Sequence, residues 1–397
     1  MISPQLIRRL ARKPLRGVTV TPRGRHRRVR LTRFELFSTL AAGDQRPAIR
    51  ERFPAAVRSA VTGDLAPILR LARFAGIGEE TGVRDFSVGT YTATTCEETA
   101  LPWDPAMPVD QRLAHAAHVV TAEAPAAFAP FDAKTALASD VLRLCERWPA
   151  SGRARAAVGP LPNVPVLVLS GSQDLRTPTG EARRVAELFP QAQMRVAQGR
   201  GHDVTGSDTL GCTSVAVRRF LTGRRLPHGC PRVRLRPRQP DPRSLRAVRP
   251  APRTRGRPGR TLAAVRQTYQ DALRSYFDLF SDRLLADTPG SDSLRFAAGG
   301  LRSGRYALTP ERGLLRNLVY VPGVRVSGRL SSVFIFPDGV LRVRGRAAAH
   351  GTLRVRNGVM SGRLGGRHVR GTLGPDLYDL AVSLSLRQFA GTSSWAP

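Results

Sequence analysis

The chain has 397 residues, enough for two or three domains, and 41% hydrophobic with 6% aromatic residues is typical of a globular protein. The formal net charge is +33, and nearly all of it is arginine, because Lys13 and Lys134 are the only lysines. This charge permits weak contact with polyanions. The arginines are spread along the chain without an aromatic-laced cluster, which argues against a specific nucleic-acid-binding protein.

Residues 1–90 have a mostly helical pattern, with apolar residues at helical intervals in 34–40 and 50–74. The first 17 residues are basic but lack the apolar segment of a secretory signal, so no signal peptide is predicted. No apolar run in the sequence is long enough for a transmembrane segment.

Residues 91–223 are expected to alternate strand and helix. The apolar run 164–169 predicts a strand that is buried on both faces. A helix over 180–189, a second strand over 193–198 and a helix over 213–222 follow it. This order predicts an α/β segment with parallel strands.

Residues 224–260 contain thirteen arginines, many prolines and one acidic residue, Asp241. This composition favours an extended, solvated interdomain linker. The alternative is an arm that binds a polyanion, with no sequence preference.

The last part of the chain, 261–397, is predicted to be a separate domain. Apolar residues at spacings of three or four predict an amphipathic helix that begins at Thr261. After Pro289 the period becomes two, with aliphatic residues alternating with arginine or small polar residues. This pattern predicts an antiparallel β-meander with one buried face and one arginine-rich face.

An acid and a base follow the two predicted parallel strands. Asp174 comes five residues after Leu169, and His202 lies in the glycine-flanked loop GRGHDV after the next strand. Because the carboxyl ends of neighbouring parallel strands share one edge, the carboxylate is expected to hold the imidazole Nδ1–H and to leave Nε2 as a base. On spacing alone, a turn acid and a surface histidine remain the alternative.

The four cysteines are Cys96, Cys145, Cys212 and Cys230. Their long spacings match no zinc pattern, and neither a metal site nor a cofactor is predicted. Three pairings are possible, of which the sequence-local one is preferred. Four buried free thiols are the alternative.

Several stretches together resemble the C-terminal part of secreted α/β-hydrolases of the tripeptidyl-aminopeptidase-like group. The resemblance covers about residues 5–232. It is carried by VPVLVLSGSQDLRTPTGEARRVAELFP, GRGHDVTGSDTLGC, RRFLTGRRLPHGCP, TTCEETALPWDP and CERWP, and more loosely by RRLARKPLRGV.

The resemblance implies a partial α/β-hydrolase fold in which 1–90 is a helical lid and 91–223 is the C-terminal half of the core. It implies that Asp174 and His202 are the acid and base of a catalytic triad, with a peptide as substrate. It also implies two disulfides, Cys96–Cys145 and Cys212–Cys230, in an extracellular protein.

The serine of such a triad lies on a G-x-S-x-G turn between a strand and a helix, and this motif does not occur in the sequence. Ser87 in DFSVGTY is the nearest match, but Asp85 replaces the first glycine, and an ordinary turn serine is expected. Ser170 and Ser172 lie on the turn of the acid itself. The nucleophile and the strands before it are expected to precede Met1.

Glu97 and Glu98 raise a second functional hypothesis. A carboxylate near the lid is a reasonable partner for the α-ammonium group of a peptide substrate. The alternative is a solvated acid pair beside Cys96.

Two functional hypotheses follow. The first is a truncated serine hydrolase of the tripeptidyl or prolyl aminopeptidase-like type, inactive without its upstream segment. The second is a non-catalytic basic remnant that binds a cell-envelope polymer or another polyanion.

Overall fold

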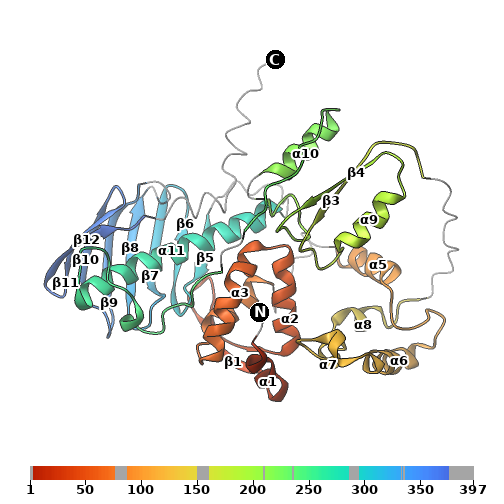
Figure 1. The fold of residues 1–397 in the computed structure, drawn as a ribbon. Coiled ribbons are helices and arrows are strands. Elements are labelled where there is room, and N and C mark those ends of the chain that lie inside the picture. The colour runs from red at the N-terminus through yellow and green to blue at the C-terminus, as the bar shows by residue number, and fades with distance from the viewer. Residues whose placement is uncertain are drawn as a thin grey trace.

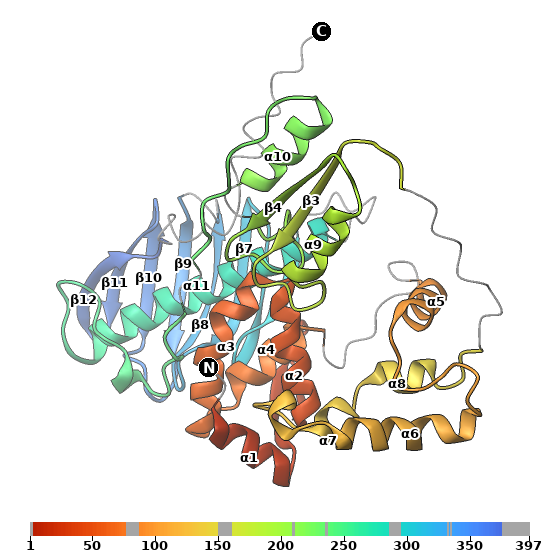
Figure 2. The same ribbon diagram turned by 45° about the vertical axis from the view of Figure 1, so that its right-hand side comes forward.

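The computed structural model describes residues 3–76, 87–149, 161–208, 211–234, 237–285, 295–331, 333 and 336–374. It combines helices with three sheets, of which the antiparallel C-terminal sheet is the largest (Figures 1 and 2). None of the helices in this part of the chain is both long and apolar enough to cross a membrane.

Residues 3–76 fold around one core. Their elements are α1 (Pro4–Arg12), β1 (Leu15–Val20), β2 (His26–Leu31), α2 (Arg33–Ala41), the 3-10 turn η1 (Ala42–Asp44), α3 (Pro47–Val61) and α4 (Ala66–Phe74). A capping box starts α2: Glu35 N–H donates to the Thr32 hydroxyl, and Thr32 N–H donates to the Glu35 carboxylate. Leu6, Leu31, Ile49 and Ile68 are among the buried residues that join these elements.

The β1–β2 hairpin was not expected within a mostly helical segment. It pairs Leu15 with Leu31 and Val20 with His26, antiparallel. The second strand reads HRRVRL, and of its six residues only Leu31 is fully buried. In β2 only Val29 and Leu31 are apolar, and arginines fill most of the other positions. An alternation of apolar and polar residues is therefore too short to be detected in the sequence.

The segment from Val88 to Cys145 is helical, which corrects the prediction that strand–helix alternation begins at residue 91. It contains α5 (Val88–Glu98), α6 (Val109–Ala122), the 3-10 turn η2 (Pro125–Phe128), α7 (Ala133–Ala136) and α8 (Asp140–Cys145). The Thr92 hydroxyl donates to the Val88 carbonyl at 2.8 Å, and the Thr94 hydroxyl does the same to Thr90 at 3.0 Å. These bonds fit threonines, which usually favour strands, into α5.

The predicted strand–helix–strand–helix order appears after residue 161 as β3 (Val166–Gly171), α9 (Thr179–Glu187), β4 (Ala192–Ala197) and α10 (Cys212–Leu221). β3 and β4 are parallel, as predicted, in register from Val166↔Ala192 to Gly171↔Ala197. They are the two strands of this sheet in the described part of the chain.

Between α10 and the long helix that begins at Gly256, the described residues form no strand and only the 3-10 turn η3 (Leu245–Ala247). They are nevertheless not a freely solvated linker. Leu226, Leu245 and Val248 are buried. Arg238 donates its backbone N–H to the Glu51 carbonyl at 3.1 Å, and its side chain forms an ion pair with the Glu51 carboxylate at 3.5 Å. The segment therefore packs against the rest of the protein. Leu245 and Val248 join the C-terminal hydrophobic core, and Arg238 contacts the N-terminal helix α3.

The long helix α11 (Gly256–Leu285) begins five residues earlier than predicted and lies across one face of an eight-stranded meander (Figure 1). The strands are β5 (Phe296–Gly299), β6 (Ser303–Leu308), β7 (Arg312–Val319), β8 (Arg325–Ser331), β9 (Asp338–Arg344), β10 (Gly351–Arg356), β11 (Val359–Leu364) and β12 (Arg367–Thr372). Each strand pairs with its sequence neighbour. Leu262, Val265, Leu273 and the inward side chains of the strands form one core, which confirms the predicted helix and antiparallel meander.

Three of the ion pairs among the described residues connect residues 3–76 to the C-terminal part, and one of them joins Arg52 on α3 to Asp278 on α11 at 2.5 Å. Arg70 on α4 donates two hydrogen bonds, of 2.6 and 2.7 Å, to the Asp271 carboxylate on α11. Arg302, in the turn between β5 and β6, does the same to Asp64, at 2.6 and 2.8 Å. Residues 3–76 therefore pack directly against the C-terminal part of the chain.

Candidate functional site

The structure brings Asp174 and His202 together at the carboxyl ends of β3 and β4. Each residue lies in the loop that follows its strand, so the parallel pairing of β3 and β4 places both loops at one edge. Glycines allow close packing here: a Cβ atom on Gly171 would lie 2.1 Å from the Gly201 carbonyl oxygen. Only a residue without a side chain fits at that point.

The Asp174 carboxylate contacts the Nδ1 side of the His202 ring. Nδ1 lies 3.1 Å from Oδ2 and 3.2 Å from Oδ1. The side chain of Asp174 is 4% exposed and that of His202 is 34% exposed. The buried acid thus orients a ring whose Nε2 has no hydrogen-bond partner among the described residues.

Hydrogen bonds keep Asp174 ionised. Burial alone would raise the pKa of Asp174, but the Thr177 N–H and hydroxyl, the Arg176 N–H and His202 bind its carboxylate and bring the pKa below the usual value. The carboxylate is therefore an acceptor that fixes Nδ1 as the protonated ring nitrogen and leaves Nε2 able to accept a proton.

Asp44 on η1 is a third site residue, and sequence analysis missed it. It is 1% exposed. One carboxylate oxygen accepts the His202 backbone N–H at 2.9 Å, and the other accepts the Leu175 N–H at 3.2 Å. Asp44 therefore fixes the backbone of both loops, but nothing in the sequence GDQRP distinguishes it from a turn acid.

The ligand atoms of Asp44, Asp174 and His202 lie within 4.8 Å of one another, close enough to surround a cation. Both carboxylates, however, already accept hydrogen bonds from backbone N–H groups of the two loops. Asp174 in particular also accepts hydrogen bonds from the Arg176 N–H, the Thr177 hydroxyl and the His202 ring, which uses most of its acceptor sites, so this arrangement favours orientation of the imidazole.

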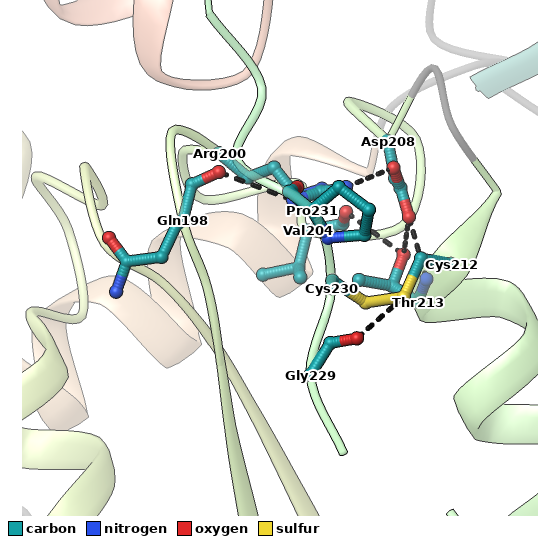
Figure 3. Close-up of a disulfide and its surroundings, with 9 residues drawn as sticks. All are labelled: Gln198, Arg200, Val204, Asp208, Cys212, Thr213, Gly229, Cys230 and Pro231. Atoms are coloured by element: carbon teal, nitrogen blue, oxygen red, sulfur yellow. Dashed lines mark hydrogen bonds and ion pairs between the residues drawn. A yellow bond between two sulfur atoms is a disulfide. The ribbon is translucent and has the colours of Figure 1, made fainter. Parts of the chain in front are cut away.

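A buried ion pair between Arg200 and Asp208 lies within the loop that also carries His202, and Figure 3 shows the pair. Arg200 is 0% exposed, and it also donates to the Pro231 carbonyl at 3.0 Å. Burial alone would raise the pKa of Asp208, but the Thr213 N–H, Arg200 and the Thr213 hydroxyl bring it below the usual value. Neither Arg200 nor Asp208 was among the site residues predicted from the sequence.

The two disulfides of the structure are Cys96–Cys145 and Cys212–Cys230, the sequence-local pairs. The second bridge joins the start of α10 to the segment that binds Arg200 (Figure 3). The bridged cysteines are 18 residues apart in the sequence, and the bridge fixes the segment whose Pro231 carbonyl accepts a hydrogen bond from Arg200.

We expect the Cys212→Ser/Cys230→Ser variant to lose about 3 kcal/mol of unfolding free energy, because loop-closure entropy is returned to the unfolded chain. Urea denaturation measures the loss, and limited proteolysis should reveal new cleavage between residues 212 and 230. The Cys96→Ser/Cys145→Ser variant is the control, since it opens the other bridge and leaves this loop closed. Equal cleavage of the 212–230 loop in both variants would contradict this account.

The structure does not join the glutamate pair to the Asp174–His202 site. Glu97 and Glu98 are exposed at the end of α5, and Glu97 accepts a hydrogen bond from the Trp148 indole at 2.7 Å. Figure 2 shows α5 apart from β3 and β4. Neither glutamate has a hydrogen bond or ion pair to Asp174 or His202 in the described part of the chain.

The three serines considered as nucleophiles have structural partners. Ser87 caps α5, accepting the Thr90 N–H at 3.2 Å. Ser170 is 2% exposed and donates to the Thr179 hydroxyl, and Ser172 accepts the Gly199 N–H at 2.9 Å. None has a hydrogen bond to His202.

Comparison with known proteins gives one finding for part of the chain. No curated protein and no solved structure matches the sequence. The family model described as TAP-like protein matches residues 129–231, which include Asp174, His202 and three of the four cysteines. The match supports a relationship of this segment to the α/β-hydrolases.

Proposed function

We propose that Asp174 and His202 are the acid and base of a serine hydrolase of the tripeptidyl or prolyl aminopeptidase-like type. The observation that carries the proposal is the 3.1 Å contact between a buried carboxylate and His202 Nδ1 at the ends of two parallel strands. This contact leaves Nε2 free to serve a nucleophile.

In this mechanism, His202 Nε2 takes the proton of the serine hydroxyl as the oxygen attacks the peptide carbonyl. The same nitrogen then gives the proton to the leaving amine. Asp174 holds the ring and stabilises the imidazolium that forms in between. Asp44 maintains the geometry through the backbone of both loops, so it is a positioning residue.

The nucleophile comes from outside the 397 residues in this proposal. The sequence has no G-x-S-x-G. The exposure of the β3–β4 sheet, which has two strands in the described part of the chain, also supports the proposal that further strands and helices cover it in the complete enzyme. Parallel strands are normally covered on both faces, yet the side chains of Leu167, Val168 and Leu169 on β3 are only half-buried. Leu188 and Leu221, beside this sheet, are 60% and 75% exposed.

Residues 1–90 would then be the helical lid of the enzyme. The contacts of Asp44 with the Leu175 and His202 loops support this role, because they dock the N-terminal helices on the strand ends. Glu97 and Glu98 remain candidates for binding the α-ammonium group of the substrate. Two disulfides favour an oxidising, extracellular compartment.

The first test is labelling of the 397-residue chain with a fluorophosphonate probe, which reacts with activated serines. We expect no labelling, because none of the serines that the structure describes forms a hydrogen bond with His202. We also expect the DNA upstream of the Met1 codon to encode a G-x-S-x-G segment in frame. Labelling that disappears in the Ser87→Ala variant would identify Ser87 as the nucleophile and overturn this assignment. A soluble, unlabelled chain without such an upstream segment would favour the non-catalytic polyanion-binding protein.

A further inference from the structure

The face of the meander opposite α11 carries a dense set of arginines. The side chains that face α11 alternate with outward ones along every strand from β8 to β12. Eight of the outward positions are exposed arginines: Arg325, Arg329, Arg342, Arg344, Arg354, Arg356, Arg363 and Arg370. We refer to these eight residues as the arginine face.

The arginine face has almost no compensating negative charge. Asp338 is the one carboxylate on β8–β12, and it accepts the Asn357 N–H at 2.7 Å. None of the eight arginines forms an ion pair in the described part of the chain. Arg363 donates its Nε–H to His368 Nε2 at 3.2 Å and keeps its terminal N–H groups for an external anion. The other seven guanidinium groups have no ion-pair partner among the described residues and face solvent.

The strand register arranges the central arginines as a checkerboard. Opposite Arg342 lie Ser327 on β8 and Thr352 on β10, and opposite Arg354 lie Val340 and Ser361. The same alternation continues with Arg363 opposite Thr352 and Arg370 opposite Ser361. Arg342, Arg354, Arg363 and Arg370 therefore never lie directly opposite one another, which limits repulsion among these four without a bound ligand. Arg325 and Arg344, at one end of β8 and β9, do lie directly opposite each other.

Arginines on adjacent strands of the checkerboard are diagonal neighbours, so their Cα atoms lie about 7–8 Å apart. An extended chain advances about 3.6 Å for every three backbone bonds, so a repeat of six bonds places successive charges about 7 Å apart. A phosphate linked through a three-carbon polyol has such a repeat. Each planar guanidinium can bind a phosphate through two parallel hydrogen bonds.

The neutral residues of the face limit the choice of polymer. The outward side chains of strands β8–β12 include no Phe, Tyr or Trp, so the strands themselves offer no platform for stacked bases. The exposed Phe336 lies in the β8–β9 loop, outside the strands, and is a single aromatic ring rather than an aromatic row. Thr352 and Ser361 instead place hydroxyl groups between the arginines, while the Ser327 hydroxyl is bonded to Asn317. Hydroxyls suit the polyol part of a polymer.

We propose that the arginine face binds a linear polyol-phosphate polymer, of the poly(glycerol phosphate) kind, laid across β8–β12. This function is independent of the Asp174–His202 site. It also lies on a different element from residues 224–260, whose arginines would bind any polyanion equally.

The test is binding of a fluorescent glycerol phosphate oligomer to the full chain, followed by anisotropy at several salt concentrations. The face variant carries Arg342→Gln, Arg354→Gln, Arg363→Gln and Arg370→Gln. The matched control carries Arg232→Gln, Arg243→Gln, Arg246→Gln and Arg249→Gln, which removes the same charge from exposed positions of residues 224–260.

We expect the face variant to bind at least about 10-fold more weakly at low salt and its logarithmic salt slope to fall by about 3, at about 0.7 for each lost phosphate contact. The control should keep both the affinity, within about twofold, and the slope of the unchanged chain. Replacing the same four face arginines with lysine keeps the charge, so the slope should persist while loss of the bidentate fork lowers the affinity.

Two results would overturn the proposal. Equal weakening in the face and control variants would mean that only overall charge matters. Tighter binding of a single-stranded oligonucleotide, inorganic polyphosphate or anionic vesicles than of the glycerol phosphate oligomer would identify a different class of partner.

Discussion

Replacing His202 with alanine should lower the turnover of a tripeptide p-nitroanilide by about 10³-fold or more in a protein that also carries the nucleophile segment. The base that accepts the serine proton would be missing, and the remaining rate would come from substrate binding and polarisation alone. Asp174→Asn should cost a similar factor, because an amide can stabilise the wrong imidazole tautomer. The measurement is kcat, with KM expected to change little.

His118→Ala is the matched control, since His118 is an exposed histidine on α6 without a role in the site. It should retain full turnover. If His202→Ala retained activity within a few-fold of the unchanged enzyme, His202 could not be the general base.

Replacing Arg70 with alanine should lower the free energy of unfolding by about 3–5 kcal/mol. The change leaves the Asp271 carboxylate, which is 11% exposed, without its partner between the N-terminal helices and α11. Burial alone would raise the pKa of Asp271, but Arg70 lowers it, so the pair stabilises the fold above about pH 4, the ordinary range of an aspartate, and less as the pH falls through the lowered pKa.

Urea denaturation of Arg70→Ala and of Arg184→Ala compares this pair with an exposed one. Arg184 and Glu181 are 73% and 52% exposed, and breaking such a pair should cost under about 1 kcal/mol. Arg70→Met/Asp271→Leu should recover most of the loss, because no unpaired charge remains. Equal losses for Arg70→Ala and Arg184→Ala would mean that burial does not strengthen the Arg70 pair.

The periodicity of apolar residues and the positions of glycines were sufficient to predict elements whose structure depends mainly on local burial or on a tight turn. The run before Asp174 is apolar on both faces, and the glycines beside His202 permit the tight loop, so a strand, an acid and a histidine could be placed in order. The C-terminal meander was predictable for a similar reason, since burial on one face forces Leu341 and Val343 to alternate with arginines.

Contacts between distant segments were not predictable from local pattern. The threonines of α5 favour a strand by propensity, but the helix is stabilised by Ser87 as its cap and by the disulfide of Cys96. Asp44 lies 158 residues before the His202 N–H that it accepts, and Arg70 lies 201 residues before Asp271. Such partners become visible only when tertiary packing is known.

The most direct test of the proposed active site is to locate the fluorophosphonate label in a protein that contains the nucleophile segment. Peptide mapping should place the label on the serine of a G-x-S-x-G outside the 397 residues, and labelling should disappear in the His202→Ala variant. A label on Ser87, Ser170 or Ser172, or labelling that persists without His202, would contradict the assignment of Asp174 and His202 as the acid and base.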